Sequence, residues 1–144
     1  MNKKIKNANP FSEDGILFKS MFELHAYQKM KELGFSPVYE PEKIQILHSF
    51  ELNKPYYVNG EPVVNQNGNP KKIRAWSYSP DFRIEHNGKV FYIEIKGFPN
   101  DVYAYKRKMF LKLINDKQNW FFCEVYKMPG LINTLNKIKD GSIG

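Results

Sequence analysis

Two acidic residues and a lysine stand at positions where a β-sheet would bring their side chains together. Asp81, Glu94 and Lys96 flank a hairpin signal, Asn87-Gly88, which separates two segments of alternating apolar and polar residues. A two-residue loop pairs residues placed symmetrically about it, so Asp81 faces Glu94 across the hairpin. Lys96 lies two residues beyond Glu94 and therefore on the same face of the sheet. The spacing predicts two carboxylates and an amine on one face.

Two carboxylates placed opposite each other on a sheet repel each other. At a separation of about 5 Å and an effective dielectric of about 20, the repulsion is roughly 3 kcal/mol before screening. A divalent cation would remove it, and a site with few oxygen ligands suits Mg²⁺ or Mn²⁺. We therefore expect Asp81 and Glu94 to hold such a cation. Lys96 would orient or deprotonate an attacking water, or balance charge in the transition state.

The pattern also has a purely structural interpretation, a solvated sheet face on which Arg83 and Lys89 compensate the acids. An acidic residue, any residue and a lysine should occur about twice by chance at this composition, and Glu94-Ile95-Lys96 is the one occurrence. The tripeptide alone therefore carries no information. A metal site is favoured because the tripeptide lies at the end of an apolar strand, opposite an aspartate.

The elements that would position these residues are predicted from periodicity. A first helix is expected over about 21–33, with Ser20 as its N-cap and Glu23 completing a capping box. A second helix is expected over about 101–115, capped by Asp101. The other expected elements are a third helix over about 130–139 and strands at 38–39, 44–50, 56–58, 62–64, 73–78, 81–86, 89–96 and 120–126. This order predicts an α+β fold around one mixed sheet.

The second expected helix carries a basic face, formed by Lys106, Arg107, Lys108 and Lys112. Such a face either is only solvated or contacts the phosphates of a nucleic acid. The whole chain has 22 lysines and arginines against 15 acidic residues, a net charge of +7 that favours a polyanionic partner.

The length of 144 residues suits one domain that needs no disulfides. We expect a basic, poorly ordered arm over residues 1–15 and a single domain over 16–144. The one cysteine, Cys123, excludes an internal disulfide and a multi-cysteine zinc site. No apolar run approaches the roughly 20 residues of a spanning helix, so we expect a cytoplasmic protein without a membrane partner.

The motifs resemble those of the PD-(D/E)XK nuclease superfamily. The resemblance is carried by Ser79-Pro80-Asp81-Phe82 and, after a hairpin, by Phe91-Tyr92-Ile93-Glu94-Ile95-Lys96-Gly97. Residues 18–23 are similar to the superfamily's first core helix, which often carries a further acid, here Glu23. The Lys-Gly ending and the basic helix after it are similar to a group of small phage proteins in this superfamily, several of them related to junction-resolving endonuclease I. The resemblance covers about residues 14–125.

The resemblance implies a restriction-endonuclease-like fold, in which helices flank a central mixed sheet, and a metal-dependent endonuclease with one or two Mg²⁺ or Mn²⁺ ions. Asp81 and Glu94 would ligate the metal with help from the backbone carbonyl of Ile95. Lys96 would activate the water. Glu23 would be a further metal ligand or catalytic acid, unless it only caps its helix.

The implied partner is DNA, with branched DNA such as a Holliday junction as one substrate, and a homodimer remains open. If the chain is phage-encoded, its compartment is the cytoplasm of a bacterial host. Two alternatives remain. One is a non-catalytic nucleic-acid-binding protein that uses the same fold for its basic surface. The other is the DNA-cleaving subunit of a larger recombination or packaging assembly.

Overall fold

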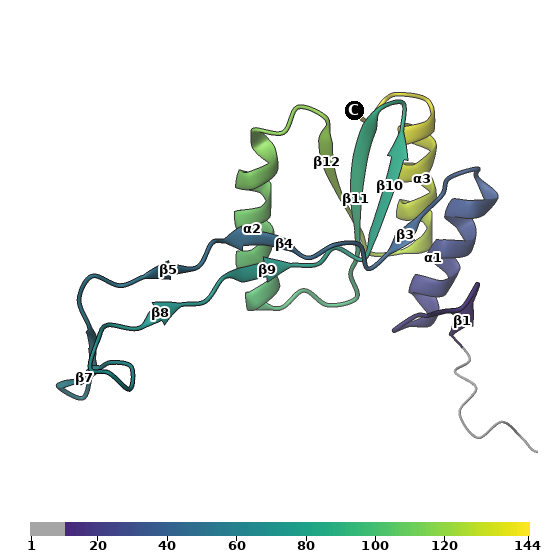
Figure 1. The fold of residues 1–144 in the computed structure, drawn as a ribbon. Helices are drawn as coiled ribbons and strands as arrows, with labels where there is room; N and C mark the ends of the chain where they lie inside the picture. Colours follow the sequence, from purple (N-terminus) through teal and green to yellow (C-terminus); the bar gives the residue numbers. More distant parts are fainter. Residues whose placement is uncertain (1–10) are drawn as a thin grey trace, which may run out of the picture.

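The centre of the fold is a four-stranded sheet with the strand order β12-β11-β10-β3 (Figure 1). A computed structural model describes residues 11–144. The sheet strands are β3 (Val38–Tyr39), β10 (Phe82–His86), β11 (Lys89–Ile95) and β12 (Trp120–Val125). β10 runs antiparallel to β3 and β11, whereas β12 runs parallel to β11. The expected α+β class with a mixed sheet is confirmed.

The hairpin between β10 and β11 has the predicted register. His86 pairs with Lys89 and Phe82 pairs with Ile93. Asn87 and Gly88 both have positive φ, 51° and 76°, as a two-residue hairpin turn of the favoured twist requires. This turn fixes which residues face each other along the full length of both strands.

Helices cover both faces of the sheet. α1 (Met21–Glu32) and α3 (Met128–Lys139) pack on one face, where the apolar residues of the hairpin form the main core. α2 (Asp101–Asn115) covers the other face and completes a second, aromatic-rich cluster. The predicted span of α2 is confirmed, but its cap is not Asp101. Asn100 is the N-cap, and its side chain accepts a hydrogen bond from the backbone N–H of Tyr103 (2.7 Å).

Residues 44–78 form a two-stranded β-ribbon that projects from the α2 side of the sheet (Figure 1). Its three paired sections are β4 with β9, β5 with β8, and β6 with β7. The bounds are β4 (Ile44–Leu47), β5 (Phe50–Glu51), β6 (Tyr56–Val58), β7 (Glu61–Val63), β8 (Lys72–Ile73) and β9 (Trp76–Tyr78). The hairpin expected at Asn59-Gly60 is confirmed at the tip. The two long strands expected at 44–50 and 73–78 are each interrupted.

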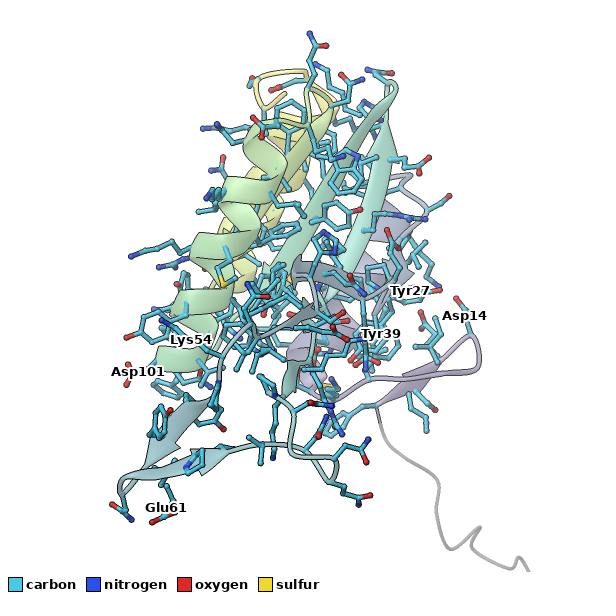
Figure 2. All side chains as sticks on the ribbon, turned by 60° about the vertical axis from the view of Figure 1, so that its left-hand side comes forward. Asp14, Tyr27, Tyr39, Lys54, Glu61 and Asp101 are labelled. Carbon is cyan, nitrogen blue, oxygen red and sulfur yellow. The ribbon has the colours of Figure 1, made fainter. Side chains whose placement is uncertain are left out.

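Part of the N-terminal arm is folded. Residues 1–10 of the expected arm lie outside the described residues. Residues 11–15, which we expected to be poorly ordered as well, belong instead to a small hairpin of β1 (Ser12–Glu13) and β2 (Ile16–Leu17). Asp14 in its turn accepts hydrogen bonds from Tyr27 and Lys31 of α1, so the hairpin is fixed to that helix (Figure 2). Among residues 11–144, no helix is long and apolar enough to cross a membrane.

Candidate active site

Asp81 lies between the last strand of the ribbon and the first strand of the hairpin. It follows the buried Pro80, and its carboxylate Oδ2 accepts a hydrogen bond from the backbone N–H of Ile95 (2.7 Å). Its backbone carbonyl accepts a second one from the N–H of Glu40 (2.8 Å). The carboxylate is therefore held against the end of β11, where the register predicted it.

Glu94 is the most deeply buried acid of the site, with 4% of its surface exposed. The hydroxyl of Tyr78, at the end of β9, donates a hydrogen bond to its Oε2 (2.7 Å). The ammonium Nζ of Lys96 lies 3.0 Å from its Oε1. Both carboxylate oxygens thus have a partner, and the side chain has one defined orientation.

The solvated-face interpretation does not fit this geometry. Glu94 is buried, and the two cations proposed to compensate the acids have other partners. Arg83 pairs with Glu42 (3.0 Å), and Lys89 donates to the backbone carbonyl of Gly144. The cation that pairs with an acid of the site is Lys96.

The site disfavours the ionised form of Asp81. Burial is the main cause, and the nearby Glu94 adds repulsion, so the pKa of Asp81 is raised to about 7. The hydrogen bond from Ile95 and the charge of Lys96 act in the opposite direction but are weaker. Burial and Glu94 also raise the pKa of the Tyr78 hydroxyl, which keeps it a proton donor. Asp81 in this environment needs a further cation nearby to be fully ionised at neutral pH.

Lys96 is positioned by an aromatic ring as well as by Glu94. Its Nζ lies 3.9 Å from the ring centroid of Tyr103 on α2, within the range of a cation–π interaction. The Tyr103 hydroxyl donates to Glu124 of β12, and that carboxylate also pairs with Arg107 (2.9 Å). A cleft of about 250 Å³ opens beside the lysine and is lined by Tyr78, Ser79, Glu94, Lys96, Asn100, Val102, Tyr103 and Lys106.

Glu23 serves as part of a helix cap. Ser20 accepts a hydrogen bond from the backbone N–H of Glu23 (3.1 Å), and its hydroxyl donates to Glu23 Oε2 (2.7 Å). The expected capping box is thus formed, with the Ser20 hydroxyl in place of its backbone N–H as the partner of the acid. The other oxygen, Oε1, accepts from the Tyr39 hydroxyl (3.1 Å). Glu23 is 6% exposed and is close enough to Asp81 to raise its pKa.

The donor set fits a magnesium-like ion with two carboxylate ligands. Within residues 11–144, no group of three or more His, Cys, Asp or Glu side chains is arranged to hold a metal. A role of Glu23 as a further ligand stays a prediction. Mg²⁺ commonly binds through one or two carboxylates and keeps several waters, which its substrate's phosphates can replace. Asp81 and Glu94 meet this requirement, and the carbonyl of Ile95 is the third expected ligand.

The four basic residues of α2 have different surroundings. Arg107 is held by Glu124, and its guanidinium lies over the Tyr103 ring. Lys106 lines the cleft, and its Nζ lies 5.3 Å from the ring centroid of Trp76 on β9. Lys108 and Lys112 are exposed. The helix therefore presents three lysines to an approaching ligand, while the arginine is engaged within the fold.

Sequence reasoning missed several residues of the site. It assigned no role to Tyr78, Tyr103 or Glu124. Lys19 was missed as well. It pairs with Glu40 (2.7 Å), which is the main cause of its raised pKa, and the charges of Glu23 and Asp81 raise that pKa further. Lys19 directly precedes the N-cap Ser20. This position beside the capping box of Ser20 and Glu23 is the only signal for Lys19 in the sequence.

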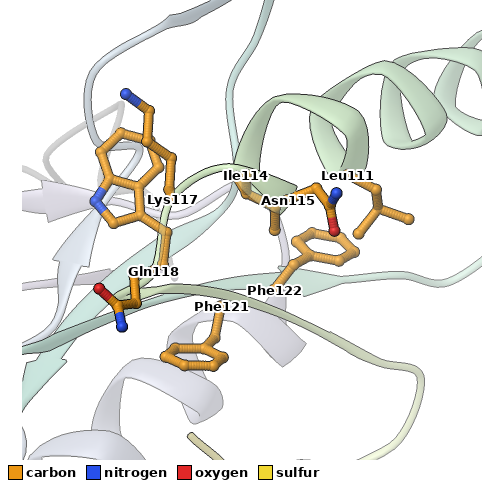
Figure 3. Close-up of a pocket in the computed structure, with 8 residues that line it drawn as sticks. Leu111, Ile114, Asn115, Lys117, Gln118, Phe121 and Phe122 are labelled. Carbon is orange, nitrogen blue, oxygen red and sulfur yellow. The ribbon is translucent and has the colours of Figure 1, made fainter.

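A second hollow lies at the far end of α2, where the helix turns into β12 (Figure 3). It measures about 440 Å³ and is lined by Leu111, Ile114, Asn115, Lys117, Gln118, Trp120, Phe121 and Phe122. The described residues that line it include no carboxylate. It lies beside the start of β12, whereas the carboxylate pair lies beside the end of β11, so the two sites are separate.

Fold and site together define a mixed α+β domain that holds two carboxylates and a lysine at one end of a hairpin. Residues 3–129 match the family model DUF1064, described as a protein of unknown function. The match covers most of the sequence, and the chain therefore belongs to the DUF1064 family. No curated protein matches the chain.

The raised pKa of Asp81 has a consequence for stability in the absence of metal. Between about pH 4 and pH 7 the unfolded chain loses this proton while the folded chain keeps it, so stability from this group falls as pH rises through about 7. Asp81→Asn removes this titration. We therefore expect the free energy of unfolding of the variant, relative to that of wild type, to be higher at pH 8 than at pH 5 by at least about 1 kcal/mol, since one pKa unit corresponds to about 1.4 kcal/mol. Urea denaturation at both pH values, in the presence of chelator, measures these free energies. Asp116→Asn, at an exposed position, is the control. An equal difference at both pH values would contradict the assignment.

The cap geometry separates two roles for Glu23. Ser20→Ala removes the cap hydroxyl and is expected to lower the free energy of unfolding by about 1 kcal/mol. Glu23→Gln is expected to cost a similar amount, and neither change should abolish Mn²⁺ binding in a calorimetric titration. Glu94→Gln serves as the positive control, because it should weaken Mn²⁺ binding. Loss of Mn²⁺ binding in Glu23→Gln but not in Ser20→Ala would make Glu23 a ligand.

Proposed function

We propose that the chain is a metal-dependent endodeoxyribonuclease that hydrolyses phosphodiester bonds in DNA, as the resemblance to the PD-(D/E)XK superfamily implies. The observation that carries the proposal is the pair of the half-buried Asp81 and the buried Glu94, with Lys96 3.0 Å from Glu94 and beside an open cleft. Branched or junction DNA is a substrate suggested by the same resemblance.

Asp81 and Glu94 would hold Mg²⁺ or Mn²⁺, one ion or two, with the carbonyl of Ile95. When bound, the ion would neutralise phosphate oxygens and make a water more acidic. The residues themselves are preorganised for this. The N–H of Ile95 fixes one carboxylate and the Tyr78 hydroxyl fixes the other, so neither has to reorient as the ion binds.

Lys96 would act on the attacking water or on the charge that develops on the phosphate. Its ammonium already lies between Glu94 and the face of Tyr103, which restricts its position without burying it, since 21% of its side chain is exposed. From this position it can donate a hydrogen bond into the cleft. The network of Tyr103, Glu124 and Arg107 would keep the ring beneath the ammonium.

Phosphate contact would come from the lysines of α2. Lys106 lines the cleft next to Glu94 and Lys96, so it is placed for a phosphate close to the scissile bond. Lys108 and Lys112 are exposed on the same helix and would contact the backbone further away. Arg107 is less suited to this role, because contact with DNA would compete with its ion pair to Glu124.

One observation favours a non-catalytic nucleic-acid-binding protein as the second candidate. Among residues 11–144, the carboxylate pair lacks the third metal-binding side chain that would make a more complete ligand set. The same basic helix and cleft would then bind DNA without cutting it. A cleaving subunit that needs partner proteins, or a homodimer, would share the site described above.

The nuclease proposal is tested by incubating the protein with linear, nicked, single-stranded and four-way DNA in Mg²⁺, Mn²⁺ or chelator. We expect cleavage only with metal. Glu94→Gln and Lys96→Ala should each reduce the rate by about 100-fold or more while the thermal unfolding transition stays cooperative. Glu85→Gln, at an exposed position of the same hairpin, is the matched control and should cleave like wild type.

Full activity in both site variants, or cleavage in chelator, would refute the proposed site. Binding without cleavage of any of these substrates at any metal concentration would favour the non-catalytic candidate.

A further inference from the structure

The β-ribbon carries several large apolar side chains that are exposed to solvent. Phe50 is 45% exposed, and at the tip Tyr56, Tyr57 and Val58 are 48%, 64% and 53% exposed. A two-stranded ribbon is marginally stable in water by itself. Large apolar side chains gathered on such an element are typical of an interaction surface.

The ribbon is also basic. Between residues 48 and 74, four cationic residues stand against two acids, Glu51 and Glu61, which leaves an excess of two positive charges. The cations are Lys54, Lys71, Lys72 and Arg74, and all four are exposed. None of them forms an ion pair with another residue of the described part, 11–144. Figure 2 places Glu61 at the outer end of the ribbon.

The base of the ribbon is part of the candidate active site. β9 ends at Tyr78, whose hydroxyl binds Glu94, and Asp81 follows three residues later. Two residues before Tyr78, Trp76 lies beneath the ammonium of Lys106, which lines the cleft. A ligand that fills the cleft therefore lies next to the base of the ribbon.

We propose that the ribbon binds duplex DNA on one side of the scissile phosphate. This inference rests on the proposed function and specifies its substrate as a duplex arm rather than a short or single-stranded end. A two-stranded β-ribbon fits the major groove of B-DNA. Lys71, Lys72 and Arg74 contact phosphates, and the exposed tyrosines at the tip provide apolar contact with sugars and bases.

Strand geometry sets the length of DNA that is needed. Strands rise about 3.3 Å per residue, so Lys72 is at most about 20 Å from Tyr78, or about 6 base pairs at 3.4 Å each. Tyr56 lies 12 residues beyond Ile44, which pairs with Tyr78, so it is at most about 40 Å from the site, or about 12 base pairs. A duplex arm of about 6 base pairs or more is therefore long enough to reach the lysines.

Charge favours DNA over a second copy of the chain as the occupant. Two copies of the ribbon would place the same excess of cations against each other, whereas a duplex brings one phosphate per about 1.7 Å of helix axis. The aromatic tip could contact either DNA or a second copy of the chain, so the charges distinguish the two and favour DNA.

The test compares Lys71→Gln/Lys72→Gln with Lys137→Gln/Lys139→Gln, which removes the same charge from exposed positions on α3, on the other face of the sheet. Affinity for a 40-base-pair duplex is measured by fluorescence anisotropy in chelator at several salt concentrations. We expect the ribbon variant to bind about tenfold more weakly, with a salt slope lower by about 1.8 because two phosphate contacts are lost. Binding to a DNA hairpin with a 4-base-pair stem should change less. The α3 variant should behave like wild type in both.

Equal affinity and salt slope for the ribbon variant and the α3 variant would overturn the proposal, as would a wild-type protein that does not bind DNA. A smaller mass in light scattering for Tyr56→Ser/Tyr57→Ser, with DNA affinity unchanged, would also overturn it, because the ribbon would then hold a second copy. The outcome is separate from that of the nuclease proposal. If DNA binding depends on the ribbon but no DNA is cleaved, the ribbon proposal is supported and the nuclease proposal is refuted. If DNA is cleaved but the ribbon variant binds it like wild type, the nuclease proposal is supported and the ribbon proposal is refuted.

Discussion

The close placement of Asp81, which is half-buried, and Glu94, which is buried, is the constraint on which the rest of this structure depends. Burial disfavours a charged carboxyl group and like charges repel each other, and the raised pKa of Asp81 reflects first its burial and then the nearby Glu94. The surrounding elements hold the pair together despite it. The Asn87-Gly88 turn sets the strand register, the Ile95 N–H fixes one carboxylate, and the Tyr78 hydroxyl fixes the other.

The remaining contacts are arranged around that pair. Lys96 supplies one positive charge, and Tyr103 keeps it in place from the helix that covers this face of the sheet. One ammonium cannot balance two carboxylates, which is why we propose that the site binds a further cation. Sites that trade stability for function in this way are common in enzymes, because the groups that do chemistry are poorly matched to each other without a ligand.

Local signals predicted the hairpin half of the site, and long-range packing decided the rest. The Asn-Gly turn and the apolar alternation were enough to place Asp81 opposite Glu94. The partners of these acids come from distant segments, since Tyr78 belongs to the ribbon and Tyr103 to α2, and neither could be selected among the 20 phenylalanines and tyrosines of the chain. The pairing of Arg107 with Glu124 depends on how α2 packs against β12, which no local pattern encodes. Asn100 and Asp101 are both good caps, and only the backbone geometry distinguishes them.

The central claim is that the two carboxylates are held together to bind a divalent cation. Anomalous diffraction from crystals soaked in Mn²⁺ tests it most directly, because it locates the ion rather than an effect of the ion. The account predicts a peak shared by Asp81, Glu94 and the carbonyl of Ile95, which is lost in Glu94→Gln. No peak at this position, or a peak that persists in Glu94→Gln, would contradict it.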